Sequence, residues 1–197
     1  MVTLHSHATR LGVLDIGSNT VHMLIVDAAP GARPEPEAST KSTIRLMQYL
    51  KDDGSIKKAG TEALLSAVEK AMKLAEEYEI TQLLVLATSA LREAPNGGKI
   101  LRKIEEAIGQ PVTVLSGVDE ARLTFLAARR WHGWDAGRLL VNDSGGGSLE
   151  VAMGSDEDPT VALSVPAGAG RVTREFLPES GVADDDDLEA ARKNIRK

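Results

Sequence analysis

The alternation of apolar and polar segments near the N-terminus predicts a β-hairpin. Two short apolar runs, Leu11–Ile16 and Val21–Ala28, have the composition of β-strands. The polar segment Gly17–Thr20 lies between them, and its glycine permits a tight turn and a close approach of a ligand to the main chain. We expect a loose leader at Met1–Arg10 before this hairpin. A surface turn at Pro30–Ser39 and a third strand at Ser42–Met47 are expected to follow it.

Helices and strands are predicted to alternate after this hairpin. Helical spacing of apolar residues predicts a helix over Thr61–Glu79, and the continuous apolar run Leu83–Ala87 predicts a strand buried on both faces. The next predicted elements are a helix at Gly97–Ile108, a strand at Val112–Leu115 and a helix ending near Trp131. Three strands followed by this alternation are typical of an α/β lobe with a mixed sheet.

The last of these helices has a recognisable start. Ser116 stands at the N-cap position, and Asp119 three residues later gives a capping-box pattern with Asp in place of the usual Glu. Glu120 then lies free in the first turn, where N–H donors and the helix dipole stabilise an anion. From spacing alone, the ordinary interpretation of Glu120 is a solvated acid on a helix face.

The strand–turn–strand pattern of the first hairpin returns after Arg138. The segment Leu139–Ala152 contains an apolar strand, an aspartate, a glycine-rich turn and another strand. A further strand is expected at Thr160–Val165, and a helix at Asp184–Arg196 has acidic residues at its start and basic residues at its end. We therefore expect a first lobe over residues 1–137 and the incomplete start of a second lobe over residues 138–197.

Composition limits the classes of partner. The 197 residues suffice for one sizeable domain or for one domain with part of another. A net charge of −6 gives no basic footprint for nucleic acid and repels polyanions, so phosphate binding must come from local donors and metal. The chain has no cysteine, which excludes disulfides and thiolate chemistry. No apolar run has the length of a membrane helix or a signal-peptide core. We expect a cytoplasmic protein without nucleic-acid or membrane partners.

Five ordered segments, spread over nearly the whole chain, carry a resemblance to a known family. They are Asp15–Thr20, Ala87–Asn96, Ser116–Leu123, Asp143–Glu150 and Pro166–Leu177. In them the chain resembles the exopolyphosphatase / guanosine pentaphosphate phosphatase (Ppx/GppA) family, part of the actin, Hsp70 and sugar-kinase fold group. The resemblance implies an α/β, actin-like (ribonuclease H-like) lobe with a mixed five-stranded sheet, followed by the start of a similar lobe. We expect the incomplete second lobe to expose apolar sheet surface and to favour a homodimer.

The same resemblance assigns roles to individual residues. It implies that Glu120 is the catalytic carboxylate, which activates water for attack on a terminal phosphorus. The expected ligands of Mg²⁺, or of another hard divalent cation, are the carboxylates of Asp15, Asp143 and Glu150. The expected phosphate-binding residues come from the two turns and one arginine: Gly17, Ser18, Asn19, Thr20, Arg92, Gly145, Gly146, Gly147 and Ser148.

Other interpretations of these residues stay open. The three glycines also suit a flexible linker between lobes. Arg92 and Asn96 follow a predicted strand, at the end where α/β sheets bind ligands, but Arg92 is equally compatible with a surface ion pair to Glu93 or Glu105. Arg45 and Arg171 are further candidates that the sequence does not settle.

The leading functional expectation is Mg²⁺-dependent release of terminal phosphate from inorganic polyphosphate. The alternative substrate is the 5′-phosphate of guanosine pentaphosphate (pppGpp), since the family covers both. A non-catalytic polyphosphate- or nucleotide-binding module is a second class. An actin-like sugar kinase or ATPase is a third, and it would need an adenosine-binding motif in the second lobe.

Overall fold

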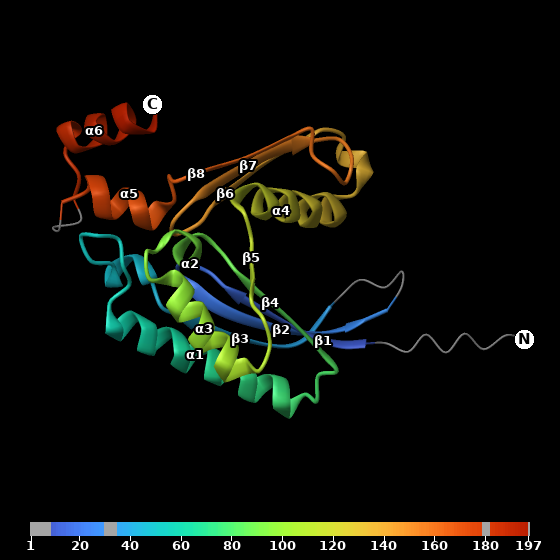
Figure 1. Ribbon diagram of the computed structural model, residues 1–197. Coiled ribbons are helices and arrows are strands. Elements are labelled where there is room, and N and C mark those ends of the chain that lie inside the picture. The colour runs from blue at the N-terminus through green and yellow to red at the C-terminus, as the bar shows by residue number, and fades with distance from the viewer. Residues whose placement is uncertain (1–8, 30–34, 179–181, 197) are drawn as a thin grey trace, which may run out of the picture.

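The computed structural model describes residues 9–29, 35–178 and 182–196. Two sheets dominate it, a larger one with helices beneath it and a smaller one above (Figure 1). Most of the predicted leader at 1–10 lies outside the described residues, and its last two residues already belong to the first strand.

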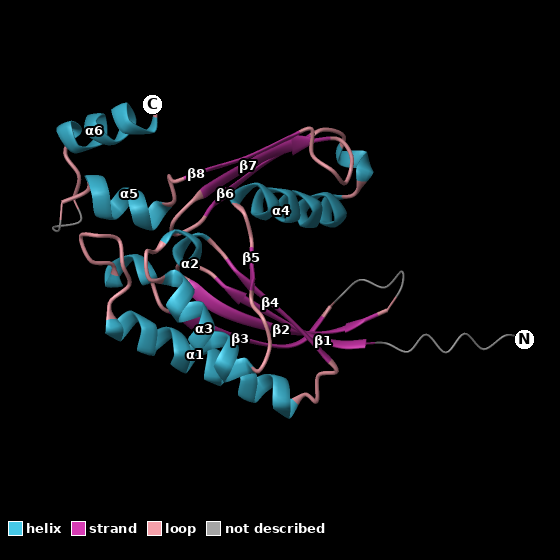
Figure 2. Cartoon of the chain, viewed as in Figure 1, coloured by secondary structure: helices cyan, strands magenta, loops and turns pink. Residues whose placement is uncertain are grey.

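The larger sheet has five strands in the order β3-β2-β1-β4-β5. Strands β1 (Thr9–Ile16), β2 (Thr20–Ala28) and β3 (Pro36–Thr43) form an antiparallel meander. Strands β4 (Gln82–Ala87) and β5 (Thr113–Val114) join the β1 edge in parallel orientation. The expected mixed five-stranded sheet is therefore confirmed (Figure 2).

The predicted third strand at Ser42–Met47 is wrong. The strand that pairs with β2 runs over Pro36–Thr43. It begins inside the predicted surface turn Pro30–Ser39, of which residues 30–34 are not described, and it overlaps the predicted strand only at Ser42 and Thr43. Its polar composition suits an edge strand, where an initial proline is tolerated. The backbone N–H groups of Ile44 and Leu46 bond the first turn instead, and a short 3₁₀ helix follows at Leu46–Tyr49.

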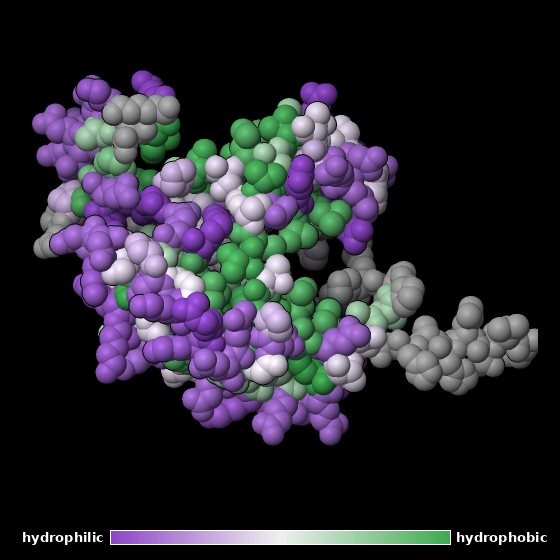
Figure 3. All heavy atoms as spheres, in the orientation of Figure 1, coloured by the Kyte–Doolittle hydropathy of each residue, from purple (hydrophilic) through white to green (hydrophobic). Residues whose placement is uncertain are grey.

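Helices cover one face of this sheet. Helices α1 (Lys58–Glu77) and α3 (Gly97–Ile108) agree with prediction to within a few residues, whereas the short helix α2 (Ser89–Glu93) was not predicted. They enclose a core that includes Leu14, Met23, Ile25, Leu64, Val85 and Ile104. Strand β4 is not buried on both faces as expected, because Leu84 is 43% exposed on the opposite side. Apolar surface is visible between the two sheets in Figure 3.

The smaller sheet is an antiparallel meander of β6 (Leu139–Ser144), β7 (Leu149–Gly154) and β8 (Val161–Val165). Helix α4 (Gly117–His132) packs Ala121 and Phe125 against Ala152 on one face of it. The predicted cap is confirmed, since the Ser116 hydroxyl accepts a hydrogen bond of 3.1 Å from the Asp119 N–H. Between α4 and β6 lies the 3₁₀ turn Trp134–Ala136.

The chain continues through two further helices. Helix α5 (Ala169–Phe176) was not predicted, and helix α6 (Asp185–Ile195) matches its prediction closely. Helix α4 precedes residue 137 but packs on the smaller sheet, so a division of the chain into lobes by packing would fall before α4. The predicted lobe boundary between residues 137 and 138 stays a prediction. No helix within the described residues is long and apolar enough to cross a membrane.

Candidate active site

The two predicted turns are built alike. In the first hairpin the Gly17 N–H bonds the Thr20 carbonyl at 2.9 Å, and in the second the Gly145 N–H bonds the Ser148 carbonyl at 3.0 Å. An aspartate precedes each turn by two residues. Asp143 lies directly opposite Glu150 in the β6–β7 register, so these two carboxylates share one face of the smaller sheet.

The glycines let the two turns approach each other. A methyl group on Gly146 would stand 2.6 Å from the Asn19 side-chain oxygen, and one on Gly147 would stand 2.6 Å from the Ser89 hydroxyl. Ser89 in turn shares a buried hydrogen bond of 2.8 Å with Ser18. Because the glycines close a hairpin and pack against the first turn, they are not a flexible linker between lobes.

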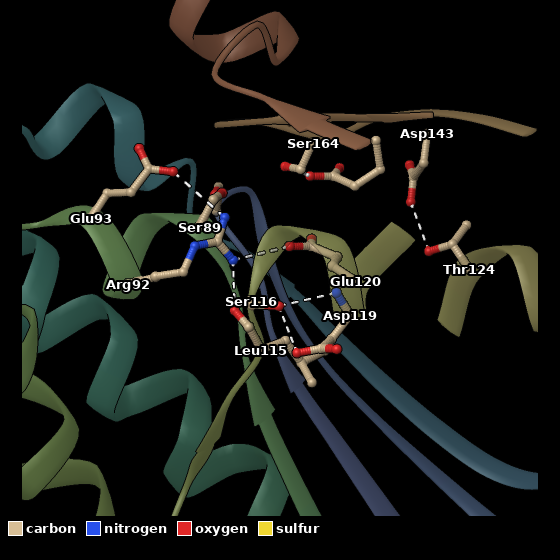
Figure 4. Close-up of polar contacts among 12 residues, drawn as sticks. Ser89, Arg92, Glu93, Leu115, Ser116, Asp119, Glu120, Thr124, Asp143 and Ser164 are labelled. Atoms are coloured by element: carbon tan, nitrogen blue, oxygen red, sulfur yellow. Dashed lines mark hydrogen bonds and ion pairs between the residues drawn. The ribbon is translucent and has the colours of Figure 1, made fainter. Parts of the chain in front are cut away.

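Asp15, Glu120, Asp143 and Glu150 lie near enough for their charges to interact where the turns, α4 and the smaller sheet meet. Figure 4 shows Glu120 and Asp143 with their polar contacts. Glu120 on α4 is joined to Arg92 by an ion pair of 3.3 Å. Glu150 is buried and accepts a hydrogen bond of 2.7 Å from the Ser164 hydroxyl on β8. Asp143 accepts one of 3.3 Å from the Thr124 hydroxyl.

Burial and mutual repulsion perturb two of these acids. Burial, then the charge of Glu150, raises the pKa of Glu120 to about 7, although Arg92 opposes the shift. Loss of solvation, together with the charge of Asp143, raises the pKa of Asp15. The expected stabilisation of a Glu120 anion at the helix start is therefore outweighed, and Glu120 has the affinity for a proton that suits a base near neutral pH.

An open pocket of about 550 Å³ adjoins these acids. Its walls include Arg92, the buried Ser148, the start of α4 and Arg171. Arg92 pairs with Glu93 at 3.6 Å and with Glu120 at 3.3 Å, so the ion-pair interpretation and a place in the site hold together. Glu105 takes no part, because it accepts the Val112 N–H.

The remaining candidates lie in different settings. Of the predicted phosphate-binding residues, Arg92 and Ser148 line the pocket, whereas the Gly17–Thr20 turn lies behind it against the glycines. Asn96 bonds the backbone of Ile56 through both its oxygen and its nitrogen, which makes it structural. Arg45 is exposed in a left-handed backbone conformation with a φ of 56°. The sequence left Arg171 undecided and did not indicate Ser164.

The carboxylates also bear on the predicted metal. Within the described ranges, no three His, Cys, Asp or Glu side chains lie close enough together to hold a metal ion. Mg²⁺, however, is commonly bound through one or two carboxylates plus substrate phosphates and water. The pKa values of Glu120 and Asp15 are raised partly by neighbouring carboxylates, and such a gathering of negative charge suits a divalent cation shared with a phosphate.

Comparison with known families adds a decisive observation. Residues 24–197 match the Ppx/GppA phosphatase family. The chain belongs to the Ppx/GppA family. It is 51% identical over 170 residues to exopolyphosphatase 1 of Mycobacterium tuberculosis, covering 86% of this chain and 49% of that relative. It is 39% identical over 188 residues to an uncharacterised protein of Streptomyces coelicolor, covering 95% of this chain and 56% of that one. The chain thus spans about half the length of the curated relatives it matches.

Solved structures share the fold of this chain. An exopolyphosphatase from Cytophaga hutchinsonii superimposes with a TM-score of 0.86 at 26% identity, over 95% of this chain and 60% of that one. The Ppx/GppA family member from Aquifex aeolicus gives 0.73 at 24% identity, over 95% and 59%. A PilM–PilN pilus biogenesis complex, at 0.56 and 15% identity over 96% of this chain and 70% of that one, shares the fold alone. The expected actin-like fold is confirmed.

Proposed function

We propose that this chain carries the catalytic half-site of a Mg²⁺-dependent exopolyphosphatase, which releases terminal phosphate from inorganic polyphosphate. The observation that carries the proposal is the position of Glu120. It lies between Arg92 and the acids of the smaller sheet, beside a pocket lined by Arg92 and Ser148. The relative named exopolyphosphatase 1, at 51% identity, supports the same activity.

Each residue has a role that its chemistry supports. Glu120, with its pKa near 7, takes a proton from the attacking water once it is ionised. Arg92 is held by the Leu115 carbonyl at 2.7 Å, so its remaining N–H groups have a fixed direction for binding a terminal phosphate. The buried Ser148, at the end of the glycine turn, lines the pocket and offers its hydroxyl to a phosphate oxygen. Catalysis then consists mainly of positioning and charge neutralisation, without a phosphoenzyme.

Asp15, Asp143 and Glu150 are the residues that we propose to hold Mg²⁺ together with substrate oxygens. When bound, the cation would neutralise charge on the phosphate chain. The cation would also reduce the repulsion among the protein's carboxylates. Glu120 would then act as the base. The cytoplasmic location expected from the sequence stays a prediction.

Guanosine pentaphosphate is the alternative substrate, because the matching family is described for both kinds of phosphatase. A binding module without turnover is the second class, since the chain spans about half of its relatives.

A substrate comparison separates these proposals. Phosphate release is measured from long-chain polyphosphate, from pppGpp, and from ATP with a sugar acceptor, each with Mg²⁺. Release from polyphosphate that exceeds release from pppGpp supports the proposal. Release from pppGpp alone favours the alternative, and binding without release from either favours the module. Phosphorylation of the sugar would overturn the proposal.

A further inference from the structure

A second arginine reaches the pocket from an element that the sequence did not predict. Arg171, on α5, lines the pocket together with Arg92, although the two residues belong to different parts of the fold. Its side chain is only 23% exposed. The proposed role of the two turns in phosphate binding does not account for a guanidinium at this point.

Two hydrogen bonds fix Arg171 to the glycine turn. Its backbone N–H bonds the Gly146 carbonyl at 2.9 Å, and its Nε donates to the Gly147 carbonyl, also at 2.9 Å. The side chain is therefore attached to the glycine turn by its inner nitrogen. This leaves the two outer nitrogens to face other partners, the fork arrangement that suits phosphate oxygens.

Two carboxylates now face those outer nitrogens, and only Glu93 accepts a hydrogen bond from them. Arg171 Nη2 donates to Glu93, and Glu175 lies 3.9 Å from Nη1. Glu93 also lies 3.6 Å from Arg92, so one carboxylate bridges two guanidiniums at the pocket wall. The Glu93 side chain is 37% exposed, and an ion pair open to water is weak enough for a multiply charged anion to replace it.

We propose that Arg171 is a second phosphate-binding arginine, which Glu93 holds in place until a phosphate of the substrate displaces that carboxylate. Arg92 contacts Glu120, whereas Arg171 contacts Glu93 and the glycine turn. Arg92 therefore serves the terminal phosphate, and Arg171 serves a phosphate further along the chain. The inference rests on the proposed function. An arginine at this second position favours substrates with several linked phosphates over a single phosphate.

The test measures direct binding of tripolyphosphate and of orthophosphate by calorimetry, so that it does not depend on turnover. Loss of one charge-assisted contact in Arg171→Gln is expected to weaken tripolyphosphate binding about tenfold. Orthophosphate binding should stay within about twofold, because the single ion binds at Arg92. Glu93→Gln is expected to tighten tripolyphosphate binding about threefold, since the competing carboxylate is gone.

Arg174→Gln is the matched control. Arg174 lies on the same helix, carries the same charge and bonds the Lys51 carbonyl outside this pocket. Equal tripolyphosphate affinities of the Arg171→Gln and Arg174→Gln variants would overturn the inference while leaving the proposed function intact. Equal weakening of tripolyphosphate and orthophosphate would overturn it too, because Arg171 would then only support the turn. A wild-type chain that binds neither anion would overturn the proposed function itself.

Discussion

At the scale of single residues, the site depends on Glu120 being a base whose proton affinity the surroundings set. Burial and the Glu150 carboxylate raise its pKa to about 7, and Arg92 lowers it. A general base must be ionised, so we expect kcat/KM to rise with pH and then to level off, with a midpoint below 7 because bound Mg²⁺ removes the repulsion from Glu150. Arg92→Gln removes the group that favours the ionised form, and should move the rising limb to higher pH.

The profile is measured at fixed ionic strength and saturating Mg²⁺, and only the midpoints are compared, since the substitution also weakens phosphate binding. A midpoint that stays in place or falls in Arg92→Gln would show that this guanidinium does not act on Glu120. Glu106→Gln, on the exposed face of α3, serves as the control that should leave the midpoint unchanged.

The sequence predicted site residues from contiguous motifs, and the roles of these residues stay predictions. Arg92, Glu120 and Ser148 each lie in such a segment, and the structure brings all three to one region. The pairing of Arg171 with Glu93 joins residues 78 positions apart and was not predictable, because no local pattern reports it.

At the scale of elements, the glycine turn allows the two hairpins to pack closely against each other. A methyl group on Gly147 would meet the Ser89 and Ser18 hydroxyls at 2.6 and 3.1 Å. Gly147→Ala should therefore lower the free energy of unfolding by about 1–3 kcal/mol and reduce phosphate binding. Urea unfolding checks this, with Gly98→Ala as control, because a methyl group on Gly98 meets nothing within 4 Å.

The double variant Gly147→Ala with Ser89→Ala should recover part of that stability, since it removes the nearest hydroxyl. Equal stability of Gly147→Ala and the wild-type chain would show that the turns tolerate separation.

A buried arginine connects α4 to the smaller sheet, and the sequence did not indicate it. Arg129 is fully buried and donates to the carbonyls of Gly133, Gly137 and Gly154. Arg129→Gln leaves some of these carbonyls without a donor and should cost about 2–4 kcal/mol, a fall in melting temperature of roughly 5–15 °C. The neighbour Arg130 pairs with Glu157 at the surface, and Arg130→Gln should melt close to the wild-type chain.

Equal melting temperatures of Arg129→Gln and Arg130→Gln would show that the buried hydrogen bonds of Arg129 stabilise the fold no more than the surface ion pair of Arg130 does.

Element-level prediction failed where tertiary pairing overrides composition. Pro36–Thr43 is polar and resembles a loop, yet it forms a strand because β2 offers it an edge. Helix α3 was predicted with its observed bounds, because Gly109 and Pro111 mark its end.

At the scale of the whole molecule, the smaller sheet leaves the face opposite α4 open, and that face exposes large apolar side chains. On the smaller sheet, Leu140 and Leu163 are 62% and 56% exposed, on the face opposite α4. Asn142 and Ser144 lie on this same open face of β6. Apolar surface of this kind favours association, and the homodimer expected from the sequence stays a prediction.

The association test is sedimentation or light scattering over a range of concentration. Leu140→Thr with Leu163→Thr keeps the strand propensity, lowers the apolar area and should shift the chain toward the monomer. Trp131→Ser, a change at an 81% exposed side chain outside the sheet, is the control. A double variant that associates as strongly as the wild-type chain would place the contact elsewhere.

The central claim is that Glu120 activates water to cleave polyphosphate. Its most direct test is the rate of phosphate release from long-chain polyphosphate with Mg²⁺, for the wild-type chain and for Glu120→Gln. Loss of a general base predicts a fall of about 10²–10⁴-fold in the variant, with polyphosphate binding retained. Equal release by the two proteins, or release by neither while both bind polyphosphate, would contradict the assignment of Glu120 as the base in this chain.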